Sequence, residues 1–170
     1  MTPKIYNALF ICTGNSARSI MAEVILNHLG RDRFKAYSAG SHPRGEVHPL
    51  TLEVLAGQHD DLRGLRSKSW TEFAAPDAPS MDFIFTVCDQ AAGEACPAWP
   101  GQPITARWGF ADPAAVVGDR ARQLKAFTNV HFQITARIRP LLALPIDKID
   151  RMSLQTQLRD LGQQGTENRA

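Results

Sequence analysis

The sequence predicts an α/β fold in which helices cover both faces of a parallel β-sheet. Short apolar stretches rich in β-branched and aromatic residues alternate with stretches of helical periodicity, and this alternation is typical of a parallel sheet with helical connections. The 170 residues suit one domain, with a main body over 1–142 and a helical extension and tail over 143–170. Such sheets bind ligands beyond the carboxyl ends of their strands.

The first half of the chain contains two predicted strands and two predicted helices. Residues 4–11 and 34–39 are apolar stretches that favour strands. Residues 18–29 place apolar side chains at helical spacing until Gly30, which favours the end of a helix. A further helix is expected over residues 48–56.

The centre of the chain is predicted to hold the rest of the sheet. A short helix is expected over residues 67–73, followed by a surface connector over 74–79 that is rich in alanine and proline. Residues 82–87 give a strong strand signal, and residues 103–106 a weaker one.

The C-terminal third is predicted to be helical. Asp119 is a suitable N-terminal cap for a long helix whose apolar residues recur at helical spacing. Pro140 should kink this helix or end its regular part. A short tail helix is expected around residues 150–161, with fraying from Gln163 onward.

Composition and charge argue against several classes of partner. The 19 basic and 17 acidic residues are well mixed and give a net charge of +2, so neither a nucleic acid nor a membrane is an expected partner. The N-terminus lacks the apolar core of a signal peptide. The longest apolar stretch near the C-terminus is interrupted by Arg137, Arg139, Pro140 and Pro145. We expect a cytoplasmic protein whose three cysteines are not a structural disulfide framework.

The segment after the first predicted strand gives the strongest functional signal. Its residues are Cys12, Thr13, Gly14, Asn15, Ser16, Ala17, Arg18 and Ser19. Backbone N–H groups of such a loop, together with a helix N-terminus, bind a tetrahedral oxyanion. The same field should favour the nucleophilic thiolate of Cys12, and the Arg18 guanidinium can donate two parallel hydrogen bonds to the anion. The bare Cys-x5-Arg spacing is weak, and a buried strand-end cysteine is the alternative, but the context favours a catalytic loop.

Several polar and aromatic residues have more than one interpretation. The Asn15 amide is expected to lock the loop and the Ser19 hydroxyl to donate to the thiolate, although both residues are also common helix caps. Four other residues could line the site but are equally consistent with positions in the core or on the surface: Lys68, Trp70, Trp99 and Trp108. The five histidines are not spaced like metal ligands, and no metal is expected.

Asp112 is the candidate general acid. A carboxylic acid on a loop above the anion can protonate a departing oxygen in the transition state. An Asp-Pro pair such as Asp112-Pro113 is also ordinary turn chemistry, but the Cys12 loop upstream favours the acid.

Cys88 and Cys96 are candidate redox partners. They flank a segment of small residues and can close a disulfide if that segment rearranges. The alternatives are inert buried thiols or two metal ligands, and zinc would require further ligands that the sequence does not offer. Because Cys12 and Cys88 both follow predicted strands, they are expected at the same edge of the sheet.

Four motifs in the same order resemble the low-molecular-weight tyrosine phosphatase superfamily. They are FICTGNSARSIMAE, YSAGSHP, FTVCDQAAGEACPAWPG and WGFADP. Within the superfamily, the chain is most similar to arsenate reductases coupled to thioredoxin or to a glutathione- or mycothiol-type thiol. The resemblance implies three layers, with a central four-stranded parallel sheet flanked by helices.

The resemblance also implies a reaction. Cys12 would attack arsenate held by the loop and Arg18, while Asp112 protonates the departing oxygen. Cys88 would resolve the Cys12–arsenic adduct, leaving a Cys12–Cys88 disulfide. Cys96 would then displace Cys12 to give a Cys88–Cys96 disulfide. No bound cofactor is expected, only an external thiol reductant, either thioredoxin or glutathione with glutaredoxin.

Two other functions remain open from the sequence. A phosphatase acting on phosphotyrosine or small aryl phosphates would use Cys12, Arg18 and Asp112 but would not need Cys88 or Cys96. A sensor that binds an oxyanion without turnover would not need Asp112.

Overall fold

The computed structural model describes residues 4–58, 62–88 and 99–167. The strands are β1 (Tyr6–Cys12), β2 (Phe34–Gly40), β3 (Phe83–Thr86) and β4 (Ile104–Arg107). The α-helices are α1 (Arg18–Leu29), α2 (Pro49–Ala56), α3 (Thr71–Ala74), α5 (Arg120–Ala143) and α6 (Arg151–Glu167). Two 3-10 turns, η1 (Pro113–Ala115) and η2 (Ile146–Lys148), precede and follow α5.

The four strands form one sheet in the order β2-β1-β3-β4, and every neighbouring pair is parallel. All four therefore end at the same edge of the sheet. Ile11 of β1 lies opposite Thr86 of β3, and the ladder continues one step through a hydrogen bond from the Val87 N–H to the Ile11 carbonyl at 2.9 Å. This register brings the residues after β1 and β3 together. The predicted four-stranded parallel sheet is confirmed.

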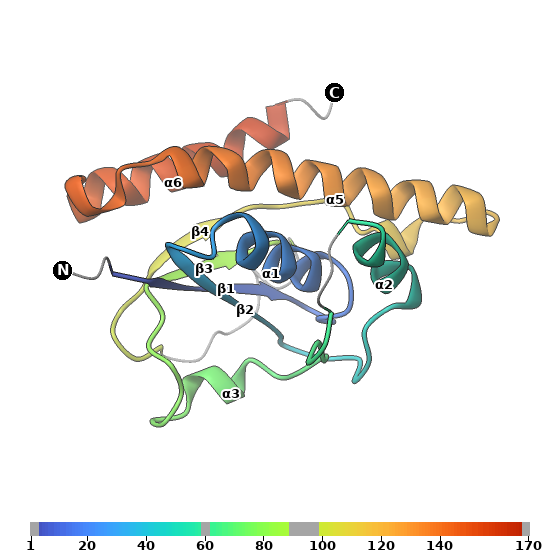
Figure 1. The fold of residues 1–170 in the computed structure, drawn as a ribbon, viewed down its shortest axis with the longest axis horizontal. Helices are drawn as coiled ribbons and strands as arrows, with labels where there is room; N and C mark the ends of the chain where they lie inside the picture. Colours follow the sequence, from blue (N-terminus) through green and yellow to red (C-terminus); the bar gives the residue numbers. More distant parts are fainter. Residues whose placement is uncertain (1–3, 59–61, 89–98, 168–170) are drawn as a thin grey trace.

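Helices flank the sheet in layers, as predicted (Figure 1). Helices α1 and α5 lie together over one side of the sheet, and the short α3 lies on the opposite side (Figure 1). Helix α6 packs along the edge strand β4. Within the described residues, no helix is long and apolar enough to cross a membrane.

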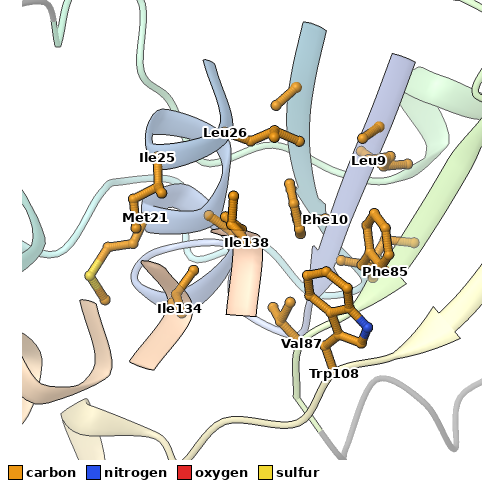
Figure 2. Packing of buried hydrophobic residues seen from close by; sticks show 14 of the residues in the cluster. Leu9, Phe10, Met21, Ile25, Leu26, Phe85, Val87, Trp108, Ile134 and Ile138 are labelled. Carbon is orange, nitrogen blue, oxygen red and sulfur yellow. The ribbon is translucent and has the colours of Figure 1, made fainter. Parts of the chain in front are cut away.

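The core joins the sheet to α1 and α5. Phe10 of β1 stacks on Phe85 of β3 with ring centroids 5.3 Å apart. Figure 2 shows Ile138 of α5 beside Phe10, with Ile25 of α1 farther from the rings in the same cluster, and both isoleucines are buried. Because these apolar residues come from four separate elements, their packing fixes the first strand and first helix in place, and with them the loop that joins the two.

The segment before α3 differs from the prediction. Residues 67–70 are not helical; instead Ser69 forms a parallel bridge with Gly40 at the end of β2. The Gly40 N–H donates to the Lys68 carbonyl at 2.9 Å, and the Trp70 N–H donates to the Gly40 carbonyl at 2.9 Å. These long-range backbone bonds override the local helical pattern, so the helix starts only at Thr71.

The C-terminal helices are longer than predicted. Helix α5 begins after Asp119, whose carboxylate caps it as expected by accepting from the Arg122 N–H at 2.9 Å, but it continues through Pro140 to Ala143. Helix α6 continues to Glu167 rather than fraying from residue 163.

Packing against β4 accounts for the length of α6. The buried Trp108 indole N–H donates to the Leu158 carbonyl at 2.9 Å. A glycine is required at position 162, since a Cβ there would lie 2.1 Å from the Arg107 carbonyl oxygen. The tertiary contact thus extends the helix beyond what its sequence indicates.

Candidate active site

A pocket of about 130 Å³ lies at the carboxyl end of β1, where the chain turns into α1. It is lined by the loop residues Cys12, Thr13, Gly14, Asn15, Ser16, Ala17 and Arg18, and by His42, Arg44, Asp112 and Ala114. Ser19, the last residue of the predicted oxyanion-binding segment, is buried behind the loop. The structure therefore brings the predicted loop and the predicted acid to one pocket.

Asn15 holds the loop from behind. It is buried and adopts a φ of +45°, a left-handed conformation that asparagine tolerates better than most residues. Its amide nitrogen donates to Ser19 Oγ at 2.8 Å, and its amide oxygen accepts from the Lys68 N–H at 2.9 Å. Helix α1 begins after Ala17 without a side-chain cap, so helix capping does not explain Asn15 or Ser19.

Arg18 connects the loop to the segment that carries Asp112. One guanidinium nitrogen donates to the Phe110 carbonyl at 3.1 Å, and the other lies 3.8 Å from an Asp112 carboxylate oxygen. The Arg18 side chain is 14% exposed, so this cation faces the pocket with little competing water.

Asp112 caps a turn and also lines the pocket. One carboxylate oxygen accepts from the Ala114 N–H at 3.0 Å and so caps the turn η1. The other oxygen faces Arg18 and the pocket. The turn therefore orients the carboxylate above the loop, and turn chemistry and a chemical role are compatible here.

Cys12 and Cys88 are both buried thiols, and their side chains lie near each other. Thr13 Oγ1 also lies 3.5 Å from Cys88 Sγ. The contact follows from the sheet, because Cys12 ends β1 and Cys88 comes two residues after the neighbouring β3. Cys96 lies outside the described residues.

The pKa of Cys12 is raised above its ordinary value. The hydrogen bond with Cys88 is the main cause, burial adds to it, and Arg18 and the Thr13 N–H act in the opposite direction. Arg18 and the loop thus lower the pKa of Cys12 as expected, but in the reduced protein Cys88 and burial outweigh them. Two neighbouring thiols cannot both ionise without placing like charges side by side.

A buried ion pair lies behind the loop. The Lys68 ammonium, 8% exposed, is 3.7 Å from a Glu23 carboxylate oxygen, which also accepts from the Ser38 hydroxyl at 2.8 Å. Burial raises the pKa of Glu23 and lowers the pKa of Lys68, and each partner opposes the other's shift. Lys68 therefore supports the loop rather than lining its rim.

The aromatic candidates do not line the pocket. Trp108 is buried in the core, and Trp70 packs edge-on against Trp99 with centroids 6.4 Å apart. One histidine has a structural role. The His48 imidazole accepts a hydrogen bond from the Leu50 N–H at 3.1 Å and so caps α2. Its pKa is lowered, first by burial and then by Arg44, while Asp112 opposes the shift.

Sequence reasoning missed His42 and Arg44. They follow β2, and the pattern of parallel strands that pointed to Cys12 and Cys88 also places residues after β2 at this edge of the sheet. Within residues 4–58, 62–88 and 99–167, no group of three acidic, histidine or cysteine side chains is arranged to hold a metal ion.

Comparison with known proteins identifies the class. The model of the low molecular weight phosphotyrosine protein phosphatase family matches residues 7–153, and the chain belongs to this family. The resemblance predicted from the four motifs is confirmed.

Arsenate reductases are among the proteins to which the chain is similar. One from Shouchella clausii is 34% identical over 131 residues, which are 76% of this chain and 90% of that protein. A solved arsenate reductase in the phosphate binding state has a TM-score of 0.65 at 28% identity and covers 82% of this chain and 98% of its own. The Corynebacterium glutamicum thioredoxin-dependent arsenate reductase has a TM-score of 0.58 at 26% identity, over 82% of this chain and 61% of its own.

Proposed function

We propose that this protein reduces arsenate to arsenite with a thiol relay that starts at Cys12. The observation that carries the proposal is the proximity of two buried thiols, Cys12, which lines the pocket, and Cys88. Hydrolysis of a phosphate ester needs one nucleophilic thiol, since water resolves the intermediate. A second buried thiol against the nucleophile is what a reduction requires, because two electrons must come from a pair of sulfurs.

Binding uses the loop and its arginine. The loop amides and the N-terminus of α1 supply positive potential, and Arg18 supplies a planar cation that can hold two oxygens of the anion. An arsenate reductase solved in the phosphate binding state is consistent with a tetrahedral oxyanion at the equivalent site.

The first step forms a sulfur–arsenic bond. Cys12 Sγ attacks arsenic in line with the oxygen that faces the mouth of the pocket, and that arsenic–oxygen bond breaks. Asp112 delivers a proton to the departing oxygen. In total, the Cys12 thiol proton and an arsenate hydroxyl leave as water, and arsenic is still in oxidation state V.

The second step reduces arsenic. The Cys88 thiolate attacks Cys12 Sγ, and the electron pair of the sulfur–arsenic bond stays on arsenic. Arsenic leaves in oxidation state III as arsenite, and a Cys12–Cys88 disulfide remains. The two sulfurs have together lost the two electrons that arsenic gained.

An external thiol completes the cycle. Cys96 is the residue that we propose to displace Cys12 from the disulfide, leaving a Cys88–Cys96 bridge for a thioredoxin to reduce. The relative described as thioredoxin-dependent supports this reductant. A glutathione-type thiol that attacks Cys12–Cys88 directly is the alternative, and it would leave Cys96 unused. We propose no bound cofactor and a cytoplasmic location.

Phosphatase activity is the second candidate because Cys12, Arg18 and Asp112 are the groups that ester hydrolysis requires. The pocket is poorly suited to phosphotyrosine, however. Of the described residues that line it, none is phenylalanine, tyrosine or tryptophan, and Asp112-Pro113 is followed by two alanines that give a substrate ring little to pack against.

A two-substrate assay tests the proposal. Reduced protein is given arsenate with thioredoxin and its reductase, or with glutathione and glutaredoxin, and separately an aryl phosphate. We expect arsenate reduction with one of the two thiol systems, and weak aryl phosphate hydrolysis. Efficient hydrolysis without arsenate reduction would replace the reductase with the phosphatase.

A further inference from the structure

A second arginine lies at the mouth of the pocket. The Arg44 side chain crosses Gly14 so closely that a Cβ on this glycine would lie 3.1 Å from Arg44 Nε. Arg44 is exposed to solvent and lines the pocket together with Arg18 and Asp112. Its guanidinium is thus not part of the core and faces the entrance that a substrate must use.

The backbone of Arg44 is fixed against the loop. Its N–H donates to the Gly14 carbonyl at 3.0 Å. On either side, the His42 N–H donates to the Thr13 carbonyl at 2.9 Å and the Gly45 N–H donates to Ser67 Oγ at 3.2 Å. The base of the Arg44 side chain therefore has a defined position relative to the oxyanion loop, although its end remains solvated.

The charge of Arg44 is available to a ligand. In the described part of the chain, no carboxylate forms an ion pair with it. Its field does reach the rim of the pocket, because Arg44 lowers the pKa of the neighbouring His48 while Asp112 raises it. Among the residues that the structure describes, Arg44 is thus a rim cation with no carboxylate paired to it.

We propose that Arg44 is a specificity-determining residue that selects free inorganic oxyanion dianions over their organic monoesters. The inference deepens the proposed function and rests on it for the reaction. Attack by Cys12 from the floor of the pocket leaves the departing oxygen facing the mouth, where Arg44 lies. An unesterified oxygen there accepts a charge-assisted hydrogen bond from the guanidinium. An ester has an organic group at that position, which gains nothing from the cation.

The test compares two variants that lose the same charge. Arg44→Gln removes the cation at the mouth. Arg31→Gln is the matched control, because Arg31 is exposed and precedes β2, at the opposite end of the sheet from the pocket. Calorimetric titration of the reduced proteins with inorganic phosphate measures binding without turnover. Thermal unfolding of both variants verifies that the fold is retained.

We expect Arg44→Gln to weaken phosphate binding roughly three- to tenfold, the range for a charge-assisted bond from a solvated side chain, and Arg31→Gln to change it less than about twofold. With substrates, Arg44→Gln should raise the KM for arsenate by a similar factor while kcat and the KM for an aryl phosphate change little. Arg44→Lys should recover part of the loss.

Two results would overturn the inference. The first is an unchanged affinity of Arg44→Gln for phosphate. The second is an equal loss of phosphate affinity in Arg44→Gln and Arg31→Gln, which would indicate only a long-range effect of net charge. A protein that binds phosphate through Arg44 but does not reduce arsenate would refute the proposed reaction and leave this role of Arg44 intact.

Discussion

Thr13 Oγ1 lies 3.5 Å from Cys88 Sγ, so the residue that follows the proposed nucleophile, Cys12, contacts the thiol proposed to resolve its adduct. The contact joins two segments that are 75 positions apart in the sequence. It exists because β1 and β3 are neighbouring parallel strands that end at the same edge of the sheet.

Removing the second thiol should lower the pKa of Cys12. The hydrogen bond with Cys88 is the main cause of the raised pKa, and Cys88→Ala abolishes both that bond and the like charge. The pH profile of Cys12 alkylation by iodoacetamide, followed on the Cys12 peptide by mass spectrometry, should therefore shift to lower pH. Cys88→Ser should shift it at least as far, because a hydroxyl can donate to the thiolate and does not ionise. An unchanged midpoint in both variants would show that Cys88 does not control the ionisation of Cys12.

Replacing the proposed acid should slow the departure of the oxygen. Asp112→Asn keeps the size of the side chain and loses the proton, and we expect kcat for arsenate to fall about a hundredfold. The comparison uses two aryl phosphates with leaving groups of very different acidity. The one with the more acidic leaving group should lose less, since it needs less protonation. Equal losses for the two esters would contradict the acid role and leave only the turn that Asp112 caps.

Breaking the buried Glu23–Lys68 ion pair behind the loop should make the free energy of unfolding depend on pH. Lys68→Met leaves the Glu23 carboxylate without its cation, and we expect a loss of about 3 kcal/mol in the free energy of unfolding near neutral pH. Burial already raises the pKa of Glu23. A neutral carboxyl needs no cation, so the loss should be small at acidic pH and grow as the pH rises through the pKa of Glu23.

Denaturant unfolding at about pH 5 and about pH 8 measures this difference. Lys125→Met, an exposed position on α5, is the matched control and should change stability by less than about 0.5 kcal/mol at both pH values. The double variant with Glu23→Gln should recover part of the loss because it removes the unpaired charge. A loss in Lys68→Met that is the same at both pH values would mean that Lys68 contributes through packing and not through its charge.

The parallel sheet and the loop could be predicted from the sequence because their signals are local. Apolar stretches mark β1 and β3, and the turn residues after β1 mark the oxyanion loop. The meeting of Cys12 and Cys88 followed from a single topological rule, that strand ends of a parallel sheet share an edge.

The supporting residues could not be assigned because their roles depend on long-range contacts. Lys68 looks like any surface lysine until the bond from its N–H to Asn15 places it behind the loop. Arg44 similarly has no local signal beyond a position after β2. The start of the helix predicted over 67–73 was wrong for the same reason, because Ser69 pairs with Gly40 and the helix begins only at Thr71. No local pattern encodes that partner.

The most direct test of the relay is a single turnover without reductant. Reduced protein receives one equivalent of arsenate, is quenched with an alkylating agent, and is mapped by mass spectrometry alongside Cys96→Ser and Cys88→Ser. We predict a Cys88–Cys96 disulfide in the natural sequence and a Cys12–Cys88 disulfide in Cys96→Ser, each with at most one equivalent of arsenite. Cys88→Ser should form no disulfide that includes Cys12 and should release no arsenite. Three alkylated thiols and no arsenite from the natural sequence would contradict the account.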